Sequence, residues 1–160
     1  MLRFMCLLIT LMTVSSALVA ETMSDLVKIE GRYHTISGNK LFTGEVSSPD
    51  IGFFKEGLRH GDWTYFHDNG QIKNQGQYVS GRKEGVWIGY YRTGKLFYKG
   101  AYKDGKKDGP WVSYYEEETL FYQGAFRLGK EQGKWVAFNP DGTVWSYRTG
   151  FYENGVKVND

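Results

Sequence analysis

Hydrophobic and polar positions alternate in short runs along most of the chain. From residue 53 onward, runs of four to eight residues rich in Trp, Tyr, Phe, Val and Ile are separated by clusters of Gly, Asn, Asp and Lys. Such runs between turn residues are typical of β-strands joined by tight turns. Helices are disfavoured, because each glycine in a helix interior costs about 1 kcal/mol and the chain has 21 glycines.

The runs recur with a period of 24 residues, which the tryptophans show most clearly: Trp63, Trp87, Trp111 and Trp135. Glycines recur two residues before each tryptophan, and a further glycine column follows at Gly76, Gly100 and Gly124. A fixed period of this kind indicates a stack of repeated supersecondary units. LFTG at residues 41–44 is similar to the second half of a unit, and residues 45–52 are interpreted as an insertion.

Each unit is expected to form a β-hairpin. Asn69-Gly70 within HDNGQ is interpreted as a two-residue type I′ loop, which needs positive φ at both central residues. This register places Trp63 opposite Gly76, and the equivalent pairs are Trp87 with Gly100 and Trp111 with Gly124. An aromatic ring can lie across a strand glycine that carries no side chain. We therefore expect the tryptophans to cover these glycines and to hold successive hairpins together.

Two copies depart from the repeat pattern. Glu118 occupies the position of the turn glycine in the third unit. In the fourth unit Arg148 occupies the glycine column, and Gly150 comes two residues late. These positions predict altered geometry in the third hairpin turn and in the last unit.

The predicted register divides the side chains between two faces. The face that carries the tryptophans, here called the packing face, also receives Tyr91, Leu96, Tyr98 and Tyr102 and their equivalents. The opposite face receives Ile88, Val112 and Val136 and is interrupted by Lys99, Gln123 and Arg148. It also carries a candidate partner-binding stripe of aromatic residues: Tyr90, Phe97, Tyr114, Phe121, Phe138 and Trp145. Exposed apolar patches mark interaction sites, whereas rings packed between neighbouring units would be structural.

The first 20 residues have the features of an export signal. Arg3 precedes an apolar stretch over residues 4–14, and small residues follow at 15–20. A membrane anchor is the alternative, although a spanning helix needs about 20 apolar residues. We interpret residues 1–20 as a signal peptide, 21–52 as an N-terminal partial repeat and cap, and 53–160 as the hairpin array. The chain is then expected in the periplasm or secreted.

Charge and residue chemistry argue against several functions. The 20 basic and 18 acidic residues give a net charge of +2, which is too balanced for a nucleic-acid surface. Cys6 is the single cysteine, so a disulfide framework is excluded. The histidines at 34, 60 and 67 are scattered, and the glutamates at 116–118 are interpreted as a solvated turn. We expect no catalytic residue, cofactor or metal.

The units GRKEGVWIGYYRTGKLFYKGAYKDG and GKKDGPWVSYYEEETLFYQGAFRLG resemble the bacterial variant of the MORN repeat, which occurs in proteins named YwqK-family antitoxins. The pattern G-x-x-x-G-x-W-x-x-Y/F occurs four times, and the resemblance covers about residues 38–157. It implies an all-β fold, an elongated single-layer antiparallel sheet of stacked β-hairpins, without catalytic residues.

The resulting functional hypothesis is an exported, non-catalytic scaffold for protein–protein interaction. One alternative is an envelope glycan- or lipid-binding module that uses the aromatic stripe and the lysines of the unit junctions: Lys83, Lys106, Lys107 and Lys130. Another is an antitoxin-like protein that neutralises a partner.

Overall fold

A computed structural model of the chain describes residues 21–37 and 40–159. Within these residues the only helical element is the short 3-10 turn η1 (Met23–Asp25). The strands are β1 (Leu26–Ile29), β2 (Arg32–Thr35), β3 (Gly44–Val46), β4 (Ile51–Lys55), β5 (Leu58–Phe66), β6 (Ile72–Val79), β7 (Arg82–Tyr90), β8 (Leu96–Lys103), β9 (Lys106–Tyr114), β10 (Leu120–Arg127), β11 (Lys130–Ala137), β12 (Gly150–Glu153) and β13 (Val156–Asn159).

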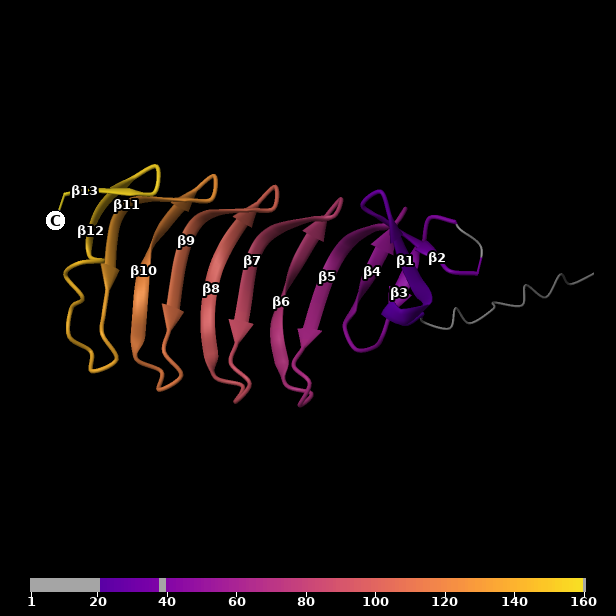
Figure 1. Cartoon of the computed structure of the whole chain (residues 1–160), viewed down its shortest axis with the longest axis horizontal. Helices are drawn as coiled ribbons and strands as arrows, with labels where there is room; N and C mark the ends of the chain where they lie inside the picture. The colour runs from indigo at the N-terminus through magenta and orange to yellow at the C-terminus, as the bar shows by residue number, and fades with distance from the viewer. Residues whose placement is uncertain (1–20, 38–39, 160) are drawn as a thin grey trace, which may run out of the picture.

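Strands β3 to β13 form one antiparallel sheet in which the spatial order follows the sequence order. Figure 1 shows these strands side by side along the long axis, with β13 at one end and the separate β1–β2 hairpin at the other. Each hairpin therefore packs against its neighbours in sequence, as in other repeat proteins. This architecture confirms the predicted all-β fold, an elongated antiparallel sheet of stacked hairpins.

The register within the hairpins is the predicted one. Trp63 pairs with Gly76 across β5 and β6, Trp87 pairs with Gly100 across β7 and β8, and Trp111 pairs with Gly124 across β9 and β10. The tryptophans and these glycines therefore lie on the same face of the sheet, since directly opposite residues of an antiparallel pair share a face.

The predicted two-residue loop at Asn69-Gly70 is wrong. The amide of His67 donates to the Gln71 carbonyl at 2.8 Å, and the amide of Gly70 donates to the His67 carbonyl at 2.9 Å. These bonds close a three-residue loop over residues 68–70, in which only Gly70 has positive φ (83°). The predicted register still holds because a register shift beside Phe66 absorbs the additional residue.

The two-residue turns lie at the other ends of the strands, between successive units. At Ser80-Gly81 and Asp104-Gly105 both residues have positive φ, as a type I′ turn requires. A non-glycine residue therefore adopts the left-handed conformation at each junction, and the glycine that follows allows the tight reversal.

The tryptophan rings lean toward the preceding hairpin. A Cβ added to Gly76 would lie within 3.0 Å of the Trp87 ring, one added to Gly100 would meet Trp111, and one added to Gly124 would meet Trp135. The expectation that tryptophans cover these glycines is correct. The expectation that each ring covers the glycine opposite it in its own hairpin is wrong, so each indole bridges two units.

The same arrangement begins one unit earlier than expected. Gly52 in β4 lies directly beneath the ring of Trp63, and Phe54 is fully buried against that ring at 5.0 Å between centroids. Residues 51–57 are therefore the second half of a unit, and the interpretation of residues 45–52 as an insertion is wrong at its C-terminal end. Gly52 lies 24 residues before Gly76, so the repeat period of the sequence already places Gly52 in the same glycine column as Gly76.

The two irregular copies keep the fold with local adjustments. Glu118 takes the left-handed conformation (φ 68°) that Gly70 and Gly94 adopt in the equivalent loops (both 83°). In the fourth unit Gly150, and not Arg148, pairs with Trp135. The two additional residues are taken up by a turn at residues 145–149, where the Thr149 hydroxyl accepts a hydrogen bond from the Ala137 amide at 3.0 Å.

The N-terminal segment covers the β3 end of the sheet. Glu21 forms a parallel bridge with Val46 of β3, and the Tyr33 amide of β2 donates to the Gly57 carbonyl at 2.8 Å. The Tyr33 ring packs on Phe54 at 4.7 Å. Residues 1–20, on which the signal-peptide prediction depends, lie outside the described residues.

Candidate interaction surfaces

The packing face is an almost continuous row of aromatic rings. The four tryptophans are buried, with exposed fractions of 5% or less. They alternate with partly buried rings that contact them: Tyr65, Tyr78, Tyr98, Tyr102, Tyr122 and Phe126. No second layer of described residues lies over this row, because the β1–β2 hairpin sits at one end of the sheet (Figure 1).

Three of the indoles are fixed by a hydrogen bond to the strand that they cross. The Nε1 groups of Trp63, Trp87 and Trp135 donate to carbonyl oxygens at 3.1 Å. The buried Nε1 of Trp111 has no acceptor among the described residues, and its ring stacks parallel to Tyr98 at 4.9 Å. Trp111 is the tryptophan that follows a proline, and Gly109 before that proline has φ of 107° instead of the 67° of Gly85.

Cationic side chains lie over the aromatic row at regular intervals. The Lys83 Nζ is 3.9 Å from the centroid of the Trp87 ring, and the Lys107 Nζ is 3.9 Å from that of Trp111. The Arg59 guanidinium lies 4.9 Å from the Trp63 ring. The placement of Lys83 and Lys107 beside the aromatic stripe is therefore wrong. They lie on the packing face, because there their methylene groups can pack on aromatic rings and their ammonium groups can form cation–π contacts.

Burial changes the ionisation of this face. It lowers the pKa of Lys83, with a smaller contribution from the nearby positive charge of Lys107, and it lowers the pKa of Lys107. Burial also raises the pKa of Tyr98 to about 12. The pKa of Tyr65 is raised by burial and by the hydrogen bond that its hydroxyl donates to Tyr78. Tyr65 and Tyr98 therefore keep their phenol protons near pH 7.

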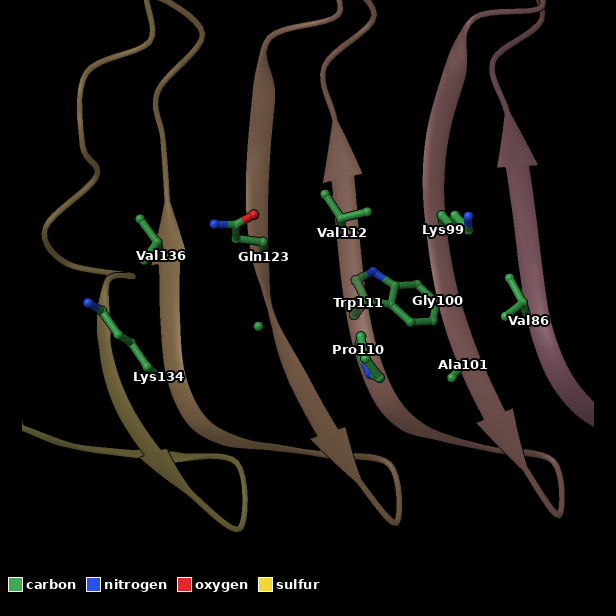
Figure 2. Close-up of a pocket in the computed structure, with 11 residues that line it drawn as sticks. Val86, Lys99, Gly100, Ala101, Pro110, Trp111, Val112, Gln123, Lys134 and Val136 are labelled. Carbon is green, nitrogen blue, oxygen red and sulfur yellow. The ribbon is translucent and has the colours of Figure 1, made fainter.

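The opposite face carries a groove of about 580 Å³ that crosses β7 to β11. Figure 2 shows its side chains in two rows across the strands, with Lys99, Val112, Gln123 and Val136 in one row and Ala101, Pro110 and Lys134 in the other. The apolar walls come from Val86, Ala101, Pro110, Val112 and Val136. A second hollow of about 420 Å³ lies nearer the N-terminal end and has a more polar lining: Asp62, Thr64, Gln75, Gln77, Val86 and Ile88 with Trp63 and Gly76.

The aromatic stripe predicted from the sequence lies outside both hollows. The bulge in β8 falls at Phe97, whose ring packs on Tyr91 at 4.8 Å and on Tyr98 at 5.5 Å. Phe121 makes the equivalent contacts with Tyr115 and Tyr122. The remaining stripe residues, Tyr90, Tyr114, Phe138 and Trp145, are partly buried. As a binding site the stripe stays a prediction.

Sequence reasoning placed Val112 and Val136 on this face but did not name them as a site. The sequence feature that indicates this groove is the recurrence of small apolar residues beside Lys99 and Gln123. These two residues pair with Val112 from its two neighbouring strands.

Among the described residues no group of three His, Cys, Asp or Glu side chains is arranged to hold a metal ion. His67 forms a hydrogen bond with the Tyr90 carbonyl at 3.0 Å, and Glu116 accepts one from Thr93 at 2.9 Å. In the described part of the chain no helix has the length and apolar character to cross a membrane.

Comparison with known families agrees with this geometry. Residues 59–80 and 83–104 each match the MORN repeat variant. Both matched segments run from the start of one long strand, through the three-residue loop, to the junction turn after the next strand. The match supports a MORN-repeat protein, and such repeats are generally non-catalytic modules. No curated protein matches the chain.

Proposed function

We propose that this chain is an exported, non-catalytic MORN-repeat scaffold that binds a protein partner in the groove of its opposite face. The observation that carries the proposal is the groove of about 580 Å³ over β7 to β11, with its apolar walls. Val86 at its edge is 53% exposed. Contiguous apolar surface of this kind on a protein marks a site of association.

The lining favours a protein as the occupant. Val112 and Val136 supply apolar contact, while Lys99, Gln123 and Lys134 supply donors for the carbonyl or carboxylate oxygens of a polypeptide. An anionic membrane surface is a poorer fit, because it is attracted by clusters of basic residues and the net charge of this chain is +2.

The test is crosslinking of a tagged chain in its native cell, identification of the crosslinked protein by mass spectrometry, and measurement of its affinity for purified variants. Val112→Ala and Val136→Ala should each weaken binding by tenfold or more, because removing two buried methyl groups from an apolar contact costs more than about 1.4 kcal/mol. Val156→Ala is the matched control, since Val156 is 64% exposed on β13 and lies outside the groove.

The alternative surfaces give different outcomes. Retained binding by folded groove variants, with loss in a Phe97→Ser and Phe121→Ser double variant, would move the site to the aromatic stripe and contradict the proposal. Salt-sensitive sedimentation with anionic vesicles would favour the lipid-binding alternative, and retention on an envelope-glycan column the glycan-binding one. Recovery of a toxin whose activity the chain suppresses would identify an antitoxin-like role.

The export part of the proposal has its own test. Residues 1–20 fused to a reporter enzyme that is active only outside the cytoplasm should give activity, and Arg3→Glu should reduce it, because a signal peptide needs a positive n-region. An inactive fusion would contradict export without affecting the groove.

A further inference from the structure

Three cationic residues form a row along the packing face, one in each successive unit. Arg59, Lys83 and Lys107 occupy the second position of β5, β7 and β9. Each head group lies over the tryptophan of its own unit, within 5 Å of the ring centroid. Because these strands alternate with β6 and β8, the backbone positions of consecutive cationic residues are separated by two strand spacings, or about 9.6 Å.

No salt bridge within the described chain includes a residue of this row. The ion pairs there join Arg82 with Asp104, Arg92 with Asp68, Lys95 with Glu118, and Arg148 with Glu131. None of them includes Arg59, Lys83 or Lys107. The Arg59 guanidinium donates to the hydroxyl of Tyr33 at 3.1 Å, which is a neutral partner.

The fourth unit has an acidic residue at the position equivalent to these three cations. Glu131 stands where the first three units have a cation, and it pairs with Arg148 at 3.5 Å. The positive row is therefore three residues long. Burial and the charge of Lys107 lower the pKa of Lys83, so a carboxylate beside Lys83 would offset repulsion within the row. Burial also lowers the pKa of Lys107, and Glu131 acts on that pKa in the opposite sense.

A hollow between the first two cations offers room for such an anion. Its volume is about 400 Å³, and its lining includes Arg59, Lys83, Tyr65 and Tyr78. Lys73 and Asn74 also line it and add further hydrogen-bond donors. Asp50 also lines the hollow, and its carboxylate accepts a hydrogen bond from the Phe66 amide at 3.4 Å.

The spacing of the cations selects the conformation of the ligand. A polyproline II helix has three residues per turn and rises about 9.3 Å per turn, so every third residue lies on the same side at nearly the spacing of the row. An extended β-strand alternates its side chains, and every third residue points to the opposite side. Aromatic grooves are also the surfaces that bind polyproline II segments, and tyrosine rings flank this row.

We propose that the packing face binds an acidic polyproline II segment of a protein, with a carboxylate at every third residue placed against Arg59, Lys83 and Lys107. This site lies on the other side of the sheet from the groove assigned to the scaffold function. If the test of the packing-face site fails, the proposal for the groove on the opposite face is therefore not affected, and the reverse also holds.

The test measures binding of the whole chain to labelled synthetic peptides by fluorescence anisotropy. One peptide contains four Pro-Pro-Glu triplets, and a second has the same composition with its glutamates placed together. The first should bind at least tenfold more tightly, because only it matches the cation spacing, and its affinity should fall as salt rises. Equal affinity for the two peptides would overturn the proposal, and this comparison needs no variant.

Variants then locate the site. Lys83→Gln and Lys107→Gln should each weaken the triplet peptide about tenfold, the value of one charge-assisted hydrogen bond. Lys106→Gln and Lys130→Gln are matched controls, because both lysines are exposed at junction turns, and they should change the affinity less than twofold. Unchanged binding by the first pair, or binding of an acidic oligosaccharide such as oligogalacturonate in place of the peptide, would refute the assignment.

Discussion

The indole of Trp87 lies over Gly76, a residue of the preceding hairpin, whereas the glycine that pairs with Trp87 in its own hairpin, Gly100, lies under Trp111. Each of the four packing-face tryptophans therefore contacts two units. The Trp87 Nε1 also donates to the Gln77 carbonyl of that preceding hairpin at 3.1 Å. The attachment between hairpins thus consists of ring burial, a hydrogen bond and the backbone ladder, all at the same place.

This attachment predicts a specific coupling between Gly76 and Trp87. Trp87→Ala should lower the free energy of unfolding by about 3–5 kcal/mol, and Gly76→Ala by about 1–3 kcal/mol, because the added methyl group overlaps the indole. In the double variant the added methyl group no longer overlaps an indole ring. The loss of unfolding free energy in the double variant should therefore be smaller than the sum of the losses in the two single variants. Urea denaturation of the four proteins measures the coupling.

The control cycle pairs Gly76→Ala with Trp63→Ala. Trp63 faces Gly76 within the hairpin but covers Gly52, so this coupling should be the smaller of the two. A larger coupling with Trp63 than with Trp87 would contradict the observed lean of the rings.

Ser113 carries a second testable feature, a buried hydroxyl without a partner. The residue is 1% exposed, and its Oγ has no hydrogen bond within the described chain. The equivalent positions are Gly89 and Ala137. Ser113→Ala should raise the free energy of unfolding by about 1 kcal/mol, because it removes an unsatisfied polar group from the interior.

Thr149→Val is the comparison for that change. The Thr149 hydroxyl accepts from the Ala137 amide at 3.0 Å and donates to the Ala137 carbonyl at 3.2 Å, so its loss should destabilise the protein by about 1 kcal/mol. If chemical denaturation showed an equal loss of stability in both variants, the interpretation of the Ser113 hydroxyl as an unsatisfied buried group would be contradicted.

The register of the hairpins was predictable because tryptophan and glycine recur at fixed positions. The loop type was not. A two-residue loop at Asn69-Gly70 and a three-residue loop with a bulge beside Phe66 produce the same pairing of Trp63 with Gly76. The pattern of strand residues therefore contains no information that separates them.

The alternation of hydrophobic and polar residues also does not predict the direction in which a side chain lies on its face of the sheet. Alternation assigns Trp87 to a face, but the choice between Gly76 and Gly100 as the glycine it covers depends on the rotamer. Lys83 is a long side chain, and its position over Trp87 is decided by packing against the ring. Residues of the groove such as Val112 were assigned to the correct face, since that assignment needs only the period of two.

Glu118 predicts a stabilising substitution. It adopts φ of 68° in a loop whose counterparts have glycine, and a left-handed conformation costs a non-glycine residue about 1–2 kcal/mol. Its ion pair with Lys95, at 3.7 Å, is exposed and worth little. Glu118→Gly should therefore raise stability by about 1 kcal/mol in thermal or urea melts, and Gly94→Glu should lower it. A loss of stability in Glu118→Gly would show that the ion pair outweighs the backbone strain.

Tyr98 predicts how the stability depends on alkaline pH. Its ordinary pKa is 10.0, and burial raises it to about 12 in the folded chain. Below pH 10 both the folded and the unfolded states keep the phenol proton. Between pH 10 and 12 the unfolded state loses that proton first, so the free energy of unfolding should fall as the pH rises through this window. Denaturant melts at a series of pH values measure the slope.

Tyr98→Phe removes the phenol and should make this slope shallower, while the difference in stability between variant and parent stays constant below about pH 9. The buried lysines act in the opposite sense. Because the pKa of Lys83 and of Lys107 is lowered from 10.5, their contribution increases as the pH rises toward that value, and it does not account for a fall. An identical slope for Tyr98→Phe and the parent between pH 10 and 12 would therefore contradict the burial of the Tyr98 phenol against Trp111.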